Sequence, residues 1–155
     1  MLITSSRKPS AGTRTLCKHL ASFFGCEYSN RGKMSMGEVL GLSHDTSLIV
    51  VGEYHGNPGS IAFYGPKGNC ILSLYISMLS APVSYSRFSG AVIEGDNELV
   101  PLIAGLLTGD VDQGSLHPVL DISENIMTFK EQEKVLFSLK IRSYKVYEGD
   151  EDCSL

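Results

Sequence analysis

The chain has 155 residues, a hydrophobic fraction of 43%, a charged fraction of 19% and a net charge of −4 at pH 7. This length and composition indicate one globular domain with enough residues to bury a core. The longest apolar stretches, residues 70–79 and 99–107, are too short to cross a bilayer, and the N-terminus lacks the apolar region of a secretory signal peptide. We therefore expect a cytoplasmic protein that makes no membrane contact.

Charge is distributed unevenly along the chain. The first 33 residues contain six Lys or Arg residues against Glu27 alone, a balance of +5, so the remaining residues carry −9. A negative total argues against nucleic-acid binding, but cations confined to one segment can still produce a strong local field. This segregation favours an anionic partner for the N-terminal segment.

The most informative stretch is residues 3–14, which we interpret as a strand, a polar loop and the start of a helix. Thr13 is predicted to be the N-cap of this helix, and Gly12 before it lets the backbone approach a ligand closely. The first amide groups of a helix carry positive partial charge, which suits a phosphate. The spacing of the apolar residues predicts that the helix buries the face formed by Leu16, Leu20, Phe23 and Phe24.

Cations from the loop and the helix are expected to form one surface. Arg14 and Lys18, four residues apart, lie on a second face of the helix, beside Arg7 and Lys8 of the loop. Tyr28 next to this cluster is a candidate for stacking on a base, although a half-buried strand tyrosine is the commoner case. The plain alternative is a surface loop with ordinary solvated cations, and the residue types alone do not decide between these interpretations.

Residues 26–85 are predicted to contain a strand, a polar turn, a short helix and three further strands. Ser35 is expected to cap a helix that runs to Leu42, with Glu38 completing a capping box. The branched apolar run at residues 48–51 is typical of a central strand buried on both faces. The predicted strands are residues 26–29, 47–54, 60–64 and 70–78, the last three forming antiparallel hairpins with turns at residues 57–59 and 67–69.

A second strand, loop and helix begins near residue 91. The strand covers residues 91–93, and the helix covers residues 98–107, capped by Asp96 or Asn97 and closed by Gly109. Strands are then predicted at residues 118–122, 126–130 and 135–147, the last broken at residues 142–143. This recurrence predicts a mixed α/β (α+β) domain over residues 1–147, with halves at about 1–85 and 86–147, and an acidic tail over residues 148–155. One continuous core is expected from Leu16, Leu20, Phe24, Ile49, Val51, Leu72, Leu74, Ile93, Leu102, Leu106 and Leu136.

No pattern of catalytic or metal-binding residues is recognisable. Residues 110–114 resemble the start of a calcium loop, but Ser115 and Asp121 stand where the loop needs Gly and Glu. The four cysteines form no CxxC pair and fit reduced thiols, and the four histidines are scattered. We therefore predict no enzymatic activity, no catalytic residue, no metal and no cofactor.

Three segments together resemble a known family: Thr-Ser-Ser-Arg-Lys-Pro-Ser at residues 4–10 followed by Thr13-Arg14, Asn-Arg-Gly-Lys at residues 30–33, and the apolar run at residues 48–51 with Gly59 beyond it. The chain resembles the Brix-domain family of ribosome-biogenesis proteins, and its length is similar to that of the short stand-alone archaeal members. The resemblance implies two pseudo-symmetric α/β halves, each similar to the anticodon-binding domain of class IIa aminoacyl-tRNA synthetases. The chain departs from the Gly-Pro-Arg signature that many members carry near the C-terminal strands, because residues 130–134 read Lys-Glu-Gln-Glu-Lys.

The resemblance implies a non-catalytic factor that binds ribosomal RNA or its precursor, with ribosomal or assembly proteins as further partners, and we expect a monomer. Two alternatives remain: an enzyme or sensor that binds a small phosphorylated ligand in the same loop, and an interaction module whose acidic second half binds a basic ribosomal protein. The expected RNA-binding residues are Ser5, Ser6, Arg7, Lys8, Ser10, Thr13, Arg14, Lys18, Arg31 and Lys33.

Overall fold

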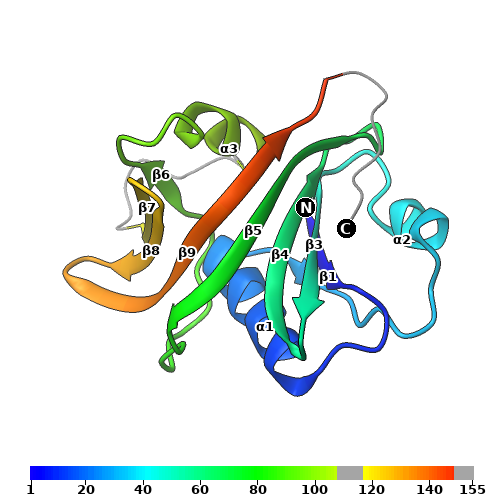
Figure 1. Ribbon diagram of the computed structural model, residues 1–155, viewed down its shortest axis with the longest axis horizontal. Coiled ribbons are helices and arrows are strands. Elements are labelled where there is room, and N and C mark those ends of the chain that lie inside the picture. Colours follow the sequence, from blue (N-terminus) through cyan, green and yellow to red (C-terminus); the bar gives the residue numbers. More distant parts are fainter. Residues whose placement is uncertain (108–116, 149–155) are drawn as a thin grey trace.

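The computed structural model describes residues 1–107 and 117–148, which form one nine-stranded mixed sheet with helices on both faces (Figure 1). Residues 149–155 of the tail expected at 148–155, the helix end at Gly109 and the calcium-like residues 110–114 lie outside the described residues. The elements are β1 Leu2–Ser5, α1 Ala11–Phe24, β2 Glu27–Tyr28, α2 Met36–Leu42, β3 Leu48–Tyr54, β4 Asn57–Tyr64, β5 Cys70–Ser80, β6 Val92–Glu94, α3 Val100–Leu107, β7 Val119–Ser123, β8 Ile126–Glu131 and β9 Lys134–Val146.

The strand order in the sheet is β2-β1-β3-β4-β5-β9-β8-β7-β6. In the first part of the chain, β1 pairs with β3 in parallel, and β3, β4 and β5 follow as antiparallel neighbours. In the second part, β6 pairs with β7 in parallel, and β7, β8 and β9 follow in the same way. Because β5 and β9 are themselves antiparallel neighbours, both parts share a single sheet. The mixed α/β fold is as predicted, whereas the likeness to synthetase domains stays a prediction.

The main core lies between the sheet and the helices α1 and α3. Leu20 and Phe23 of α1 and Ile103 of α3 belong to one buried cluster with the sheet residues beneath them. The predicted continuous core is confirmed, since each of its residues is either buried in this cluster or packed against it. Helix α2 lies on the other face of the sheet, where Val39 packs against Leu2, Leu48 and Val50.

Several local predictions are confirmed, and three need correction. Ser35 and Glu38 do form the capping box of α2. The N-cap of α1 is Ser10 and not Thr13, because Ser10 has an extended backbone and its hydroxyl accepts a hydrogen bond from the Thr13 amide. The first hairpin turns at residues 55–56, where both backbone φ angles are positive, as a two-residue turn requires, so residues 57–59 already belong to β4. Strand β9 is continuous, with a bulge at Arg142 where a break was expected.

The cysteines differ from one another. Cys17 and Cys26 are buried free thiols, and burial raises their pKa values to about 12 and about 11. Cys70 is disulfide-bonded, so the prediction of four reduced thiols is wrong at this position. Among the residues that the structure describes, none of the helices has the length and apolar character needed to span a membrane.

Candidate nucleic-acid interface

The start of α1 is already bound to a carboxylate from β3. Ser10 caps the helix, and the Glu53 carboxylate accepts a hydrogen bond from the Ser10 amide. Hydrogen bonds from the Ser10 hydroxyl, the Ser10 amide and the Thr13 hydroxyl lower the pKa of Glu53. The negative charge that was expected from a phosphate at this helix start is therefore supplied by the protein itself.

Arg31 lies inside the protein. Its side chain is 5% exposed, and its Nε and Nη1 donate hydrogen bonds to the carbonyl oxygens of Met34 (2.7 Å) and Ser5 (3.0 Å). Burial, together with the nearby charge of Arg7, lowers the pKa of Arg31. This guanidinium fastens the end of β1 to the loop before α2, and it does not face solvent. Ser5 and Thr13, two further residues of the expected interface, are also buried.

The other expected cations are exposed and lie on two adjoining loops and on α1. The Nε of Arg7 also donates to the Met34 carbonyl (3.3 Å), so the loop after β1 and the loop before α2 meet at one acceptor. Lys8 in the first loop has a positive φ of 53° and an exposed side chain. Lys33 is exposed beside Met34 in the second loop. These contacts bring Arg7, Lys8 and Lys33 to one region of the surface.

Tyr28 on the edge strand β2 lies near α1 and near Arg87, a cation that was not among the predicted site residues. The Nζ of Lys18 lies 6.0 Å from the centre of the Tyr28 ring. Burial raises the pKa of Tyr28, and Arg14 is close enough to oppose this rise in part. The Tyr28 hydroxyl is buried and has no hydrogen-bond partner among the described residues. A cavity of about 460 Å³ beside it is lined by Lys18, Tyr28 and Arg87 together with residues of α1 and β2.

Arg87 reaches this region because residues 81–91 pass over α1. The Tyr85 hydroxyl donates to the His19 carbonyl (2.8 Å), the Phe88 amide donates to the Ser22 carbonyl (2.9 Å), and Arg87 Nη2 donates to the carbonyl of Cys26 (2.7 Å). These residues have no strand or helix periodicity, so the sequence offered only the pair of aromatic residues around Arg87 as a signal. We call Arg7, Lys8, Arg14, Lys18, Lys33 and Arg87 together the basic surface.

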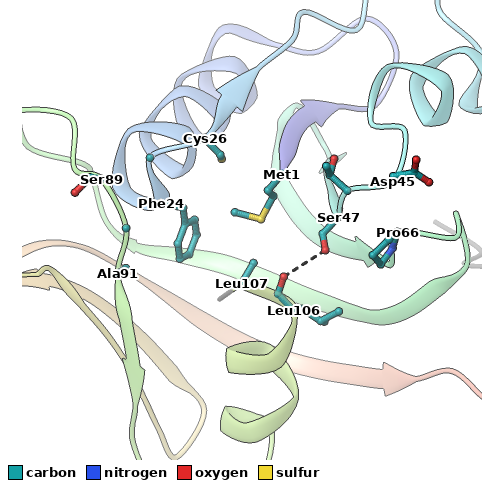
Figure 2. A pocket seen from close by; sticks show the side chains of 13 residues that line it. Met1, Phe24, Cys26, Asp45, Ser47, Pro66, Ser89, Ala91, Leu106 and Leu107 are labelled. Carbon is teal, nitrogen blue, oxygen red and sulfur yellow. Dashed lines mark hydrogen bonds between the residues drawn. The ribbon is translucent and has the colours of Figure 1, made fainter. Parts of the chain in front are cut away.

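A second cavity, of about 380 Å³, lies between the end of α1 and the end of α3 (Figure 2). Its walls include Met1, Phe24 and Leu107, and the Ser47 hydroxyl donates to the Leu106 carbonyl at 3.3 Å across it. The described residues that line it include no Lys or Arg side chain. This cavity is a packing space between the two parts of the chain and not a continuation of the basic surface.

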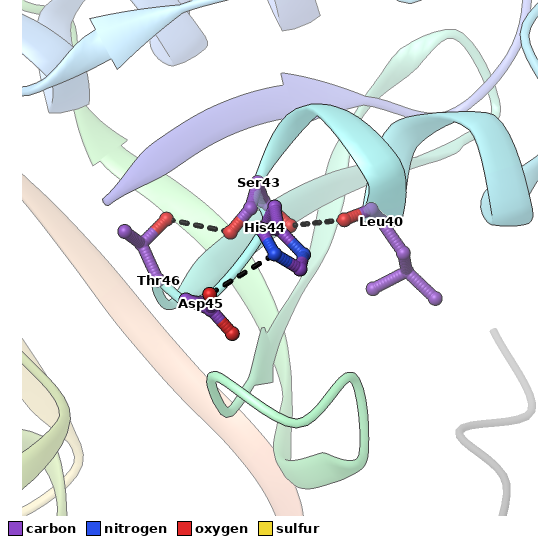
Figure 3. A network of polar contacts seen from close by, with 5 residues as sticks. All are labelled: Leu40, Ser43, His44, Asp45 and Thr46. Atoms are coloured by element: carbon purple, nitrogen blue, oxygen red, sulfur yellow. Dashed lines mark hydrogen bonds and ion pairs between the residues drawn. The ribbon is translucent and has the colours of Figure 1, made fainter.

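The turn after α2 holds a histidine and a carboxylate in contact (Figure 3). His44 Nε2 lies 3.0 Å from Asp45 Oδ2, and both side chains are 82% exposed. The hydroxyls of Ser43 and Thr46 close the turn by donating to the carbonyls of Leu40 and Ser43. Such a solvated pair has no buried partner to orient it, so it has the features of a turn and not of a catalytic dyad. Among the described residues no group of three His, Cys, Asp or Glu side chains is placed to hold a metal.

Comparison with known proteins decides the family. A relative from Methanococcoides burtonii, named "Probable Brix domain-containing ribosomal biogenesis protein", is 42% identical over 152 residues, which cover 94% of this chain and 96% of the relative. The chain belongs to the Brix domain-containing ribosomal biogenesis protein family. A Brix relative of the same name from Methanosarcina barkeri is 38% identical and covers 95% of this chain and 100% of its own length. No protein-family model matches the chain.

Two solved structures of archaeal proteins have folds similar to that of this Brix protein. The crystal structure of Mil, an archaeal Imp4-like protein, has a TM-score of 0.72 and 28% sequence identity, and it covers 95% of this chain and 100% of Mil. A probable ribosomal biogenesis protein from Aeropyrum pernix K1 has a TM-score of 0.66 at 22% identity, over 90% of this chain and 92% of that one. The second likeness concerns the fold alone.

Proposed function

We propose that this Brix protein is a non-catalytic ribosome-biogenesis factor that binds ribosomal RNA or its precursor through the basic surface. The family carries the role in ribosome biogenesis, as the names of the relatives state. The observation that best supports RNA binding is that Arg87 and Lys18 lie beside Tyr28 at one cavity. Arg87 thereby adds a third chain segment to the cations of the first 33 residues. Cations gathered in this way bind phosphates even though the whole chain carries −4.

The hydroxyl groups near the basic surface supply additional donors. Ser6 and Ser10 are partly exposed at the loop that carries Arg7 and Lys8. Hydrogen bonds from such side chains to phosphate oxygens fix the position of an RNA strand without reading its sequence. Arg31, Ser5 and Thr13 are buried and do not contact RNA directly in this proposal. They stabilise the loops that carry the exposed cations.

The competing function, capture of a small phosphorylated ligand at the start of α1, is disfavoured by Glu53. The carboxylate already accepts the Ser10 amide, so a phosphate monoester would have to displace it or share its place. Two negative groups so close together repel each other strongly. A polyanion that spreads its phosphates over Arg7, Lys18 and Arg87 does not need the start of α1, although Glu27 also lines the cavity beside Lys18 and Arg87.

The proposed function is tested by the salt dependence of RNA affinity. We expect fluorescence anisotropy with a labelled single-stranded RNA of about 12 nucleotides to give a log–log slope of roughly −3 to −4, the value for about five phosphate contacts to a single strand. The Arg7→Ala/Lys8→Ala double variant should bind more weakly and flatten the slope by roughly 1 to 1.5, and Arg87→Ala should flatten it by about 0.7.

Lys134→Ala is the matched control, because Lys134 is an exposed cation at the start of β9, outside the basic surface. It should leave the slope close to that of the unchanged protein. Equal losses in Lys134→Ala and in the double variant would replace the proposed site with diffuse charge attraction. An unchanged slope in the double variant would remove the basic surface from RNA binding.

A further inference from the structure

Strands β4 and β5 separate at one end of the sheet and leave an open slot between them. Their pairing runs from Tyr64 opposite Cys70 to Ser60 opposite Tyr75 and goes no further. Beyond that point the first residues of β4 pair only with β3, while β5 continues to Ser80 alongside β9. Figure 1 shows the two strands diverging there. A cavity of about 880 Å³ fills this end of the sheet, a volume in the range of sites for small organic groups.

Two exposed tyrosines line the slot. Tyr54 at the end of β3 is 71% exposed, and Tyr75 on β5 is 44% exposed. The His55 ring lies 4.2 Å from the Tyr54 ring, centre to centre, at an angle of 72°. A Cβ on Gly59 would stand 2.6 Å from the Tyr54 Cβ, so only glycine allows the Tyr54 side chain to lie against the strand here. Exposed rings beside an apolar slot can stack on another flat ring.

Because β9 has a bulge, a guanidinium also lines the slot. Tyr75 is opposite Ser143, and Ile76 is opposite Ile141, so Arg142 between them has no partner in the β5 register. Arg142 is exposed and lines the slot. A guanidinium in this place can stack on a ring or pair with a phosphate, and both contacts are typical of RNA-binding sites.

The slot adjoins the basic surface through Glu53. This residue lines the slot, and its carboxylate holds the Ser10 amide at the end of the loop that carries Arg7 and Lys8. Among the described residues that line the slot, it is the one acidic residue. Because its charge is directed to the start of α1, the slot itself presents rings, apolar side chains and a cation to a ligand.

We propose that the slot between β4 and β5 holds an unpaired base of a single RNA strand, stacked on Tyr54 or Tyr75, with Arg142 at the adjoining phosphate. This inference rests on the proposed RNA binding and adds a second surface to it. The aromatic rings accept any base, so the slot contributes affinity and not sequence preference. Glu53, which lines the slot and contacts the Ser10 amide, links the slot to the loop after β1, so one strand can contact both surfaces.

The test uses the same labelled RNA of about 12 nucleotides. It compares the affinity and the salt slope of tyrosine variants with those of the cation variants. Whichever of Tyr54→Ala and Tyr75→Ala removes the stacking ring should weaken binding by about 5- to 150-fold, the range for loss of one stacked base, and leave the salt slope unchanged because no cation is removed. Unchanged affinity in both variants would overturn the proposal. Tyr54→Phe should keep the affinity, since the ring remains. Tyr144→Ala is the control, because Tyr144 is an exposed β9 tyrosine outside the slot.

A second measurement keeps the slot separate from the basic surface. Addition of AMP or UMP at millimolar concentration should shift the aromatic NMR signals of Tyr54 and Tyr75 in the unchanged protein and equally in the Arg7→Ala/Lys8→Ala variant. Loss of RNA affinity in the cation variant alone, with no shift of the tyrosine signals, would overturn the slot and leave the proposed function standing. Shifted tyrosine signals and weaker binding in the tyrosine variants, with no effect of the cation variant, would support the slot and reject the basic surface.

Discussion

At the scale of single residues, the charges of this protein have two different tasks. Arg31 and Glu53 are turned toward backbone groups, on the carbonyls of Met34 and Ser5 and on the Ser10 amide. Hydrogen bonds to a charged group contribute roughly 1.5–3 kcal/mol where they are buried, as at Arg31, and less where solvent screens them, as at Glu53. Both residues hold the loops in place. The cations of the basic surface are exposed, although Arg7 and Arg87 each also donate one hydrogen bond to a backbone carbonyl. The degree of burial, and not the residue type, distinguishes Arg31 from these cations.

The Glu53 contact makes the stability of the protein depend on pH. Since the folded state lowers the pKa of Glu53 below 4.5, the contact stabilises the protein above about pH 4.5 and is lost as the pH falls through the lowered value. Glu53→Gln should therefore unfold at lower urea concentration than the unchanged protein at pH 7, and the difference should shrink as the pH falls below 4.5. Urea denaturation followed by circular dichroism measures both. A constant difference between the two proteins from pH 7 to pH 3 would contradict the role of this carboxylate.

At the scale of elements, local chemistry was enough to predict much of the fold. Ser35 and Glu38 specify the start of α2 within four residues, and hairpin patterns specify β3 to β5. The interface was predicted less well, because its geometry depends on residues that are distant in sequence. Arg87 meets Lys18 through a segment without periodicity, and the burial of Arg31 follows from the position of β1. The separation of β4 from β5 was not predicted from the sequence, and the β9 bulge was predicted only as a break at residues 142–143.

A single substitution at the end of α1 can test how residues 81–91 are held in position. Gly25 ends α1 with a φ of 68°, and a Cβ there would stand 2.5 Å from the Phe88 carbonyl oxygen. Gly25→Ala should lower the free energy of unfolding by roughly 1–3 kcal/mol, because the left-handed backbone becomes strained and the segment must shift. RNA affinity should fall about as much as in Arg87→Ala, since the same guanidinium is moved.

Gly12→Ala provides the matched control for this prediction. Gly12 lies inside α1, its nearest neighbour for a new Cβ is the Ser10 hydroxyl at 3.9 Å, and alanine favours the helix. Chemical denaturation should show equal or greater stability for Gly12→Ala and unchanged RNA affinity. Gly25→Ala binding RNA as tightly as the unchanged protein would show that residues 81–91 do not position Arg87.

At the scale of the whole molecule, the two parts of the chain share one core. Phe23 of α1, in the first part, lies 5.0 Å from the Phe129 ring of β8, and Phe129 stacks on Phe137 of β9 at 4.2 Å. All three rings are fully buried. Together with the β5–β9 pairing, these contacts mean that neither part can lose its structure without exposing the apolar surface of the other.

This shared core predicts that β1 to β5 unfold together with β6 to β9. Phe23→Ala should cost roughly 3–5 kcal/mol, the usual range for a buried phenylalanine, although the residue belongs to the first part alone. In native-state hydrogen exchange, the slowest amides of β3 and of β8 should lose protection by the same free energy. Leu42→Ala, at a 59% exposed position on α2, should change both by less than about 0.5 kcal/mol. If the β8 amides kept their protection in Phe23→Ala while those of β3 lost it, the two parts would be independent units, and a ligand on the basic surface could not stabilise the second part.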